Sequence, residues 1–113
     1  MKLTRDWDIT PDHIVATLGT TFGLSTAIRA FTEKGDGVII QHPSYGRFDR
    51  AMVRNGRKVV SNPLKEQNGI YNLDFEDLEL KMSQPENKML VLVNPHNPTG
   101  RIFDKTDLEK ISV

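Results

Sequence analysis

Three short segments of this sequence combine residue types that can hold a planar, anionic molecule. The first is Gly19-Thr20-Thr21, where glycine lets the backbone approach a ligand closely and free amides at the start of a helix can face a phosphate. The two threonine hydroxyls add further donors. A strand-to-helix turn with good caps explains the same residues, and both interpretations stay open at this point.

The other two segments supply an aromatic ring and a restrained amide. Tyr45 follows Pro43, and a ring at a strand end can stack on a planar cofactor, with about 0.5–1.5 kcal/mol gained beyond area burial. Asn97 lies between Pro95 and Pro98. Their rings fix φ, so the asparagine amide is held where it can donate to a phenolate oxygen. The alternatives are a tyrosine that packs on its own helix and a turn that only ends a strand.

Alternating strand and helix patterns position these segments. Short apolar runs predict strands buried in a sheet, and apolar residues spaced by three or four predict helices. Thr20 or Thr21, Asp74 and Asp104 are predicted helix caps, and the acidic run after position 73 predicts a solvated helix face. The polar stretch 65–72 predicts a loop or a small hairpin. The predicted strands are Ile14–Leu18, Val38–Gln41, Lys58–Ser61 and Met89–Val93, and the predicted helices contain Leu24, Ala27, Ile28 and Phe31, then Tyr45–Arg54, then Phe75, Leu78 and Met82, then the residues after Asp104.

This order of elements predicts an α/β fold built from βαβ units with a parallel sheet. In open sheets of this kind, ligands bind beyond the carboxyl ends of the strands. All three chemistry-bearing segments follow a predicted strand, so we expect them to line one crevice.

Composition limits the class of protein. The chain has 113 residues and a mass of 12.8 kDa, which suits one domain or part of one. Fifteen basic and fifteen acidic residues cancel, so we expect no nucleic-acid or membrane partner. There is no cysteine, which excludes disulfides, thiolate nucleophiles and cysteine-bound metals. No apolar run is long enough to span a bilayer and the first residues lack a secretory pattern, so we expect a cytoplasmic protein.

Other catalytic patterns are missing. His13, His42 and His96 lack the spacing of metal ligands, so we expect no metal site. The nucleophile motif G-x-S-x-G and the phosphate motif G-x-x-x-x-G-K-[ST] are both absent. The candidate site residues are Gly19, Thr20, Thr21, Tyr45 and Asn97.

The segment Asn94-Pro-His-Asn-Pro-Thr-Gly-Arg101 resembles the signature loop of fold-type I pyridoxal-phosphate enzymes, the class I/II aminotransferase family. Its histidine after Asn-Pro and its arginine after glycine are similar to those of the cystathionine β-lyase type of C–S lyase. Agreement with that subgroup covers nearly the whole chain, for example at 27–31, 35–43 and 55–58. The resemblance implies pyridoxal 5′-phosphate (PLP) as cofactor, an amino acid as substrate, and the large cofactor-binding domain of the PLP-dependent transferase fold.

Position by position, the resemblance assigns a role to each segment. Gly19, Thr20 and Thr21 match the loop that holds the cofactor phosphate. Tyr45 matches the aromatic residue that stacks on the pyridine ring, and Asn97 matches the asparagine that hydrogen-bonds the ring hydroxyl oxygen. The two threonines stand where the lyase subgroup more often has apolar residues, which leaves the backbone amides as donors.

The resemblance also implies an incomplete domain. In the family, the aspartate for the pyridine nitrogen, a tyrosine, the Schiff-base lysine and later arginines all follow the asparagine loop, whereas only the 13 residues Arg101–Val113 follow Gly100 here. We therefore expect residues 1–113 to be a single partial domain, a fragment of the PLP-binding large domain without a catalytic residue and inactive by itself. The full-length enzyme is expected to be a homodimer.

Three functions stay open. The resemblance favours a fragment of a C–S β-lyase that acts on sulfur amino acids. An amino-acid aminotransferase is the first alternative, because both reactions begin with removal of the same α-proton. A non-catalytic binding module is the second, and the short last helix near Ile111 argues against a finished domain.

Overall fold

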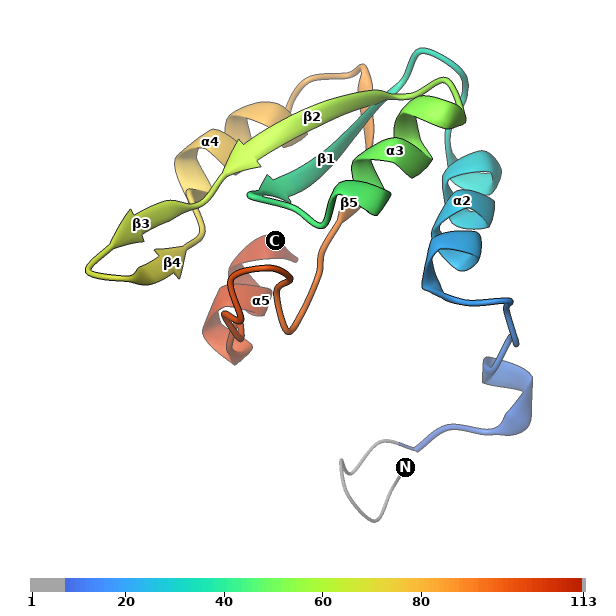
Figure 1. The fold of residues 1–113 in the computed structure, drawn as a ribbon, viewed down its shortest axis with the longest axis horizontal. Helices are drawn as coiled ribbons and strands as arrows, with labels where there is room; N and C mark the ends of the chain where they lie inside the picture. Colours follow the sequence, from blue (N-terminus) through green and yellow to red (C-terminus); the bar gives the residue numbers. More distant parts are fainter. Residues whose placement is uncertain (1–7, 113) are drawn as a thin grey trace.

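The structure, a computed structural model, describes residues 8–112 and is built on a parallel sheet (Figure 1). Its three strands are β1 (Gly37–His42), β2 (Lys58–Pro63) and β5 (Asn87–Val91), in the order β2-β1-β5. Both pairings are parallel, with Val38 opposite Val59 on one side and Met89 on the other. The predicted α/β fold with a parallel sheet is therefore confirmed.

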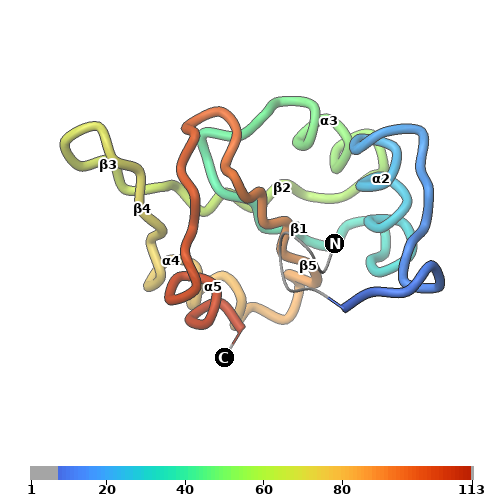
Figure 2. Tube along the Cα trace, turned by 90° about the horizontal axis from the view of Figure 1, so that it is seen from below, coloured from blue at the N-terminus to red at the C-terminus, as the bar shows by residue number. Residues whose placement is uncertain are grey.

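Helices cover both faces of the sheet. Figure 2 shows α2 (Thr20–Phe31) and α3 (Gly46–Arg54) on one side, and α4 (Phe75–Met82) and α5 (Lys105–Ile111) on the other. A short 3-10 helix, η1 (Pro11–His13), precedes α2. The stretch 65–72 forms a two-stranded antiparallel hairpin of β3 (Lys65–Gln67) and β4 (Ile70–Asn72). Across residues 8–112, every helix is too short or too polar to cross a membrane.

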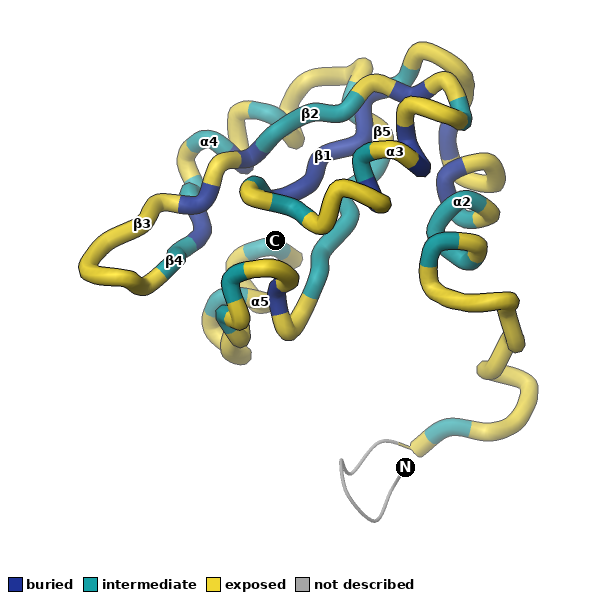
Figure 3. The backbone as a smooth tube through the Cα atoms, viewed as in Figure 1, coloured by how far each residue is buried: buried dark blue, intermediate teal, exposed yellow. Residues whose placement is uncertain are grey.

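The core lies along β1, which is buried over its whole length apart from its last residue (Figure 3). A central strand in a parallel sheet is covered on both faces, and the continuous apolar run of Val38, Ile39 and Ile40 meets that requirement. Val38 and Ile40 pack with residues of α2 and α3 in one cluster. The two helices that flank the candidate site therefore rest on β1, and their positions depend on its side chains.

The prediction of a strand at Ile14–Leu18 is wrong. The segment has no regular structure after η1 and runs away from the sheet (Figure 1). Ile14, Val15 and Leu18 are 61%, 85% and 90% exposed. A run of apolar residues supplies the side chains of a strand, but a strand also needs a neighbour for its backbone hydrogen bonds. No strand of residues 8–112 lies beside this segment.

The acidic face of α4 is less solvated than predicted. Asp74 caps the helix as expected, because its side chain accepts the backbone N–H of Asp77. Asp77 also accepts a 2.7 Å hydrogen bond from buried Asn62 and pairs with Lys81. Burial acts to raise the pKa of Asp77, but the hydrogen bonds from Lys81 and Asn62 outweigh burial and hold that pKa below its ordinary value. The carboxylate therefore helps to fix α4 against β2.

Sheet edges predict self-association of the isolated 113-residue chain. Among the strands between residues 8 and 112, β2 and β5 each have a neighbour on one side only. Unpaired backbone groups on such edges pair readily with another chain. We expect light scattering to show oligomers that grow with protein concentration. A single monomeric species at high concentration would contradict this prediction.

Candidate functional site

One cavity of about 450 Å³ brings the three chemistry-bearing segments together. Gly19, Thr20 and Thr21 lie on one wall, and Tyr45 and Asn97 complete the predicted set. The segments come from the start of α2, the turn between β1 and α3, and the loop after β5. Four residues that were not predicted also line the cavity: Leu18, Phe22, Arg47 and Phe48.

The first wall is the start of α2. Gly19 is the N-cap residue, with φ 109° and ψ 165°, and no side chain caps the helix. The Gly23 N–H donates to the Gly19 carbonyl at 3.1 Å and closes the first turn. Within the part of the chain that the structure describes, the N–H groups of Thr20, Thr21 and Phe22 therefore have no backbone acceptor, as expected for the first turn of a helix.

This geometry corrects the predicted threonine cap. Thr20 and Thr21 are the first two residues of the helix, so their hydroxyls stand beyond the N-cap position. The backbone amides of the first turn therefore have no side-chain cap, and the residues that carry them line the cavity. The positive end of a helix with free amides attracts anions.

The second wall is Tyr45, which joins β1 to α3. Its ring meets the Phe48 ring edge to face, with centroids 5.4 Å apart and an angle of 86° between the planes. The Tyr45 carbonyl accepts the Phe48 N–H at 2.8 Å and starts the helix. Tyr45 is 37% exposed and lines the cavity, so it packs on its own helix and also belongs to the candidate site. The two interpretations of this residue are compatible.

The third wall is the loop that carries Asn97. The Asn94 side chain clamps the base of this loop, because it accepts the Phe103 N–H and donates to the Phe103 carbonyl, each at 3.0 Å. Inside the clamp, the His96 N–H donates to the Arg101 carbonyl and the His96 carbonyl accepts the Gly100 N–H, each at 2.7 Å. The restraint predicted from the two prolines is thus supplemented by backbone and side-chain hydrogen bonds.

His96 is the buried centre of that loop. Only 2% of the residue is exposed, its Nδ1 lies 2.8 Å from the Thr99 hydroxyl, and its ring packs on Phe103. Burial lowers the pKa of His96 below its ordinary value of 6.5 and the nearby His42 lowers it further, while a backbone hydrogen bond with Gln41 acts in the opposite direction. Neutral imidazole is therefore the stable form at pH 7.

The neutral state of His96 predicts acid sensitivity. Below about pH 6.5 the unfolded chain binds a proton at this histidine before the folded chain does, so the free energy of unfolding falls as the pH falls toward the lowered folded-state pKa. Urea unfolding followed between neutral pH and about pH 5 measures this slope. His96→Gln is expected to flatten it, because glutamine does not titrate in this range. Equal slopes in the wild type and His96→Gln would contradict the assignment.

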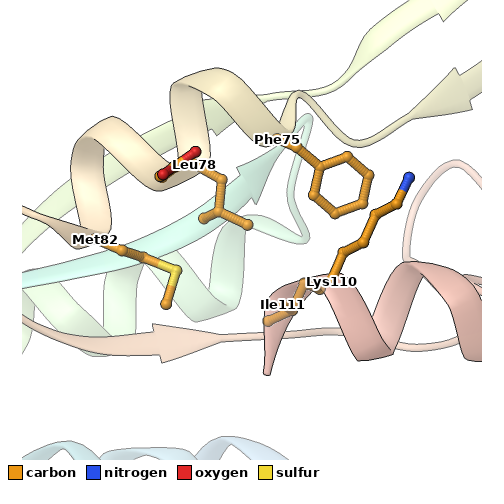
Figure 4. A pocket seen from close by; sticks show the side chains of 6 residues that line it. Phe75, Leu78, Met82, Lys110 and Ile111 are labelled. Atoms are coloured by element: carbon orange, nitrogen blue, oxygen red, sulfur yellow. The ribbon is translucent and has the colours of Figure 1, made fainter. Parts of the chain in front are cut away.

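A second cavity of about 410 Å³ lies between α4 and α5. Figure 4 shows Phe75, Leu78 and Met82 of α4 facing Lys110 and Ile111 of α5. Its walls are mainly apolar, and the Lys110 ammonium lies 5.0 Å from the centre of the Phe75 ring. It contains none of the predicted site residues, and its mainly apolar walls suit a planar anionic molecule less well than the first cavity does.

Arg47 is the charged residue of the first cavity that the sequence-based prediction missed. It follows Tyr45 by two residues, and its guanidinium carbon lies 5.8 Å from the centre of the Tyr45 ring. Its spacing from Arg50 and Arg54, by three and seven residues, would have placed all three on one helix face. Phe22, Leu18 and Phe48 carried no comparable sequence signal.

Comparisons with known proteins agree with this arrangement. The family model described as aminotransferase class I and II matches residues 2–113. Cystathionine beta-lyase PatB from Bacillus subtilis is 43% identical over 111 residues, which cover 98% of this chain and 29% of that protein. An aspartate aminotransferase from Sulfolobus acidocaldarius is 35% identical over 106 residues, covering 92% and 26%. The chain thus spans less than a third of the length of these relatives.

A solved structure of a PLP-containing protein has the same fold over this segment. The crystal structure of cystalysin from Treponema denticola, which contains a pyridoxal 5′-phosphate cofactor, superposes with a TM-score of 0.95 at 41% sequence identity. The match covers 98% of this chain and 28% of the cystalysin chain. The arrangement of helices around the three-stranded sheet is therefore that of a segment of a PLP-binding protein.

Proposed function

Because the chain belongs to the aminotransferase class I and II family, we propose that it forms the part of a PLP-dependent enzyme that binds the cofactor ring and phosphate. The observation that carries this proposal is the convergence of Gly19, Tyr45 and Asn97 on one cavity of about 450 Å³. The residues present fit the cofactor chemically, since they offer free amides for an anion, an aromatic face for a ring and an amide for a ring oxygen.

Each segment has one task in this proposal. The amides of Gly19, Thr20 and Thr21 and the positive end of α2 bind the phosphate. Tyr45 stacks against the pyridine ring, and Asn97 donates a hydrogen bond to the ring oxygen. When bound, the cofactor supplies an electron-withdrawing ring that stabilises the charge left by loss of a substrate proton. Residues 1–113 orient that ring and contribute no proton-transfer group, so the chain alone is inactive.

For the whole protein, we propose a C–S β-lyase that acts on sulfur amino acids. The 43% identity with cystathionine beta-lyase PatB and the 41% identity with cystalysin support it. An amino-acid aminotransferase is the alternative, supported by the 35% identity with an aspartate aminotransferase. We also propose that the whole protein is a cytoplasmic homodimer, as enzymes of this family commonly are, and that residues 1–113 are one partial domain of it.

Cofactor binding by the chain is tested with calorimetric titrations of PLP. Tyr45→Ala removes the stacking ring and is expected to weaken binding about tenfold, whereas Tyr45→Phe keeps the ring and the affinity. Asn97→Ala should weaken binding by a similar factor because a hydrogen bond to a charged oxygen is lost. Equal affinities of all variants would refute the proposed site. Borohydride treatment is expected to give no adduct at any one specific residue, because the proposal makes binding non-covalent.

The reaction is tested on the whole protein with cystathionine as substrate. Release of a thiol together with pyruvate supports the lyase, whereas transfer of the amino group to a keto acid supports the aminotransferase. Binding of PLP without either product supports the third possibility, a binding module that kept the fold and lost catalysis. That last result would contradict both enzymatic proposals.

A further inference from the structure

One face of α3 concentrates positive charge. Arg47, Arg50 and Arg54 are spaced by three and four residues and line a shallow cavity of about 270 Å³ together with Thr21 of α2. Between residues 8 and 112, none of these three guanidinium groups forms a salt bridge. The chain has no net charge, so this face is a local excess and not part of a general basic surface.

Only Arg47 connects this basic face to the candidate site. It lines the 450 Å³ cavity as well as the 270 Å³ cavity, and Thr21 is the other residue that the two cavities share. Arg50 and Arg54 are absent from the lining of the larger cavity. Arg50 instead donates its Nε–H to the Gly46 carbonyl at 3.0 Å, within its own helix.

The nearest acidic residue in the sequence does not neutralise Arg47. Asp49, in the first turn of α3, accepts a 2.6 Å hydrogen bond from the Ser44 hydroxyl. Its other oxygen lies 3.4 Å from the His42 ring. Both contacts hold the carboxylate against the end of β1. No hydrogen bond or salt bridge from another residue between 8 and 112 occupies the Arg47 donors, so they can reach a ligand in the cavity.

From these contacts we propose that Arg47 is an oxyanion-binding residue of the site, which pairs with a phosphate or carboxylate group of a ligand held against Tyr45. A guanidinium group presents five N–H donors in a planar fork that matches either oxyanion. The Arg47 guanidinium carbon lies over the Tyr45 ring, 5.8 Å from the ring centre, so the fork stays at the cavity that both residues line. The identity of the ligand as a pyridoxyl compound rests on the proposed function, whereas the anion contact does not.

Four stable pyridoxyl compounds separate the two sources of the oxyanion. N-(5′-phosphopyridoxyl)-L-alanine has both groups, phosphopyridoxyl-ethylamine lacks the carboxylate, pyridoxyl-L-alanine lacks the phosphate, and pyridoxyl-ethylamine lacks both. Their affinities are measured by calorimetry for the wild type, Arg47→Gln and Arg54→Gln. Arg54→Gln is the matched control, because it removes the same charge from the same helix face outside the larger cavity. Circular dichroism checks that both variants fold.

If Arg47 pairs with the phosphate, Arg47→Gln is expected to weaken binding of the two phosphorylated compounds about tenfold or more and to leave the other two unchanged. If Arg47 pairs with the carboxylate, the two compounds that contain alanine are expected to lose affinity instead. Arg54→Gln should change every affinity by less than about twofold. An equal loss for all four compounds, or no loss at all, would overturn the proposal.

A wild type that binds none of the four compounds would instead refute the proposed function. In that case a titration with inorganic phosphate, followed by NMR at the arginine Nε–H groups, decides the inference. A saturating shift at Arg47 that exceeds the shift at Arg54 supports an anion site without PLP. No difference between the two arginines overturns it.

Discussion

Replacing Gly19 with alanine is expected to remove most of the phosphate-dependent affinity for PLP, a loss of about tenfold or more. Gly19 has φ 109° and ψ 165°, a backbone conformation that is nearly restricted to glycine and costs another residue about 1–3 kcal/mol. Open space surrounds the position of the added Cβ, so the effect comes from the backbone and not from a steric clash. Relief of that strain would turn the first amides of α2 away from the cavity.

Gly35→Ala is the matched control for this prediction. Gly35 has φ +94° and the same open space around an added Cβ, but it lies in the turn between α2 and β1, outside the cavity lining. Both variants should lose a comparable amount of stability in urea unfolding. Only Gly19→Ala should lose affinity for PLP. Its affinity for pyridoxal, which has no phosphate, should stay near that of the wild type. Parallel losses for PLP in both variants would show that the glycine loop has no particular role in binding.

Truncation of Ile40 is expected to give the largest loss of stability, about 2–5 kcal/mol. The side chain is fully buried in β1 and packs with Ile28, Phe48 and Met52. Ile40→Ala removes apolar contacts and leaves a void beneath α2 and α3. A loss of this size is a large fraction of the stability of a small domain. Chemical denaturation followed by circular dichroism measures it.

Ile14→Ala is the matched control, because it makes the same substitution at an exposed position. It deletes the same atoms from a side chain that is 61% exposed and lies outside the core clusters. Its effect should stay within about 0.5 kcal/mol. A similar loss in both variants would mean that the sheet core is not where β1, α2 and α3 place it.

Local patterns predicted most of the fold. The apolar residues Val38, Ile39 and Ile40 identified the central strand, because such a strand is covered on both faces. Asp104 marked the start of α5, where its side chain accepts the Asp107 N–H as predicted. These signals were reliable because the residues that create them are neighbours in sequence.

Tertiary context decided the elements that the sequence did not predict. Ile14–Leu18 has the composition of a strand but no neighbouring strand among those described. Phe31 fits the apolar spacing of α2, yet it is 76% exposed because the helix contacts the core through Ile28. In each case the pattern described the segment correctly and carried no information about what lies beside it.

The same distinction applies to the site. Gly19, Tyr45 and Asn97 could be expected to meet because each segment was assigned to the carboxyl end of a strand. Two of the three do follow a strand, and Gly19 reaches the cavity through the start of α2 instead. Arg47 escaped prediction because a charged residue on a helix is usually solvated. Its place in the lining of the 450 Å³ cavity, where Arg54 is absent, distinguishes it from Arg54.

The most direct test of the account is an NMR titration of the ¹⁵N-labelled chain with PLP. We predict saturating shifts for the backbone N–H groups of Thr20 and Thr21 and for the side-chain amide of Asn97, because all three residues line the proposed site. The amides of Leu78 and Ile111, which line the cavity between α4 and α5, should stay unchanged. Shifts confined to Leu78 and Ile111, or no saturating shift at Thr20, Thr21 and Asn97, would contradict the central claim that these three segments form one cofactor site.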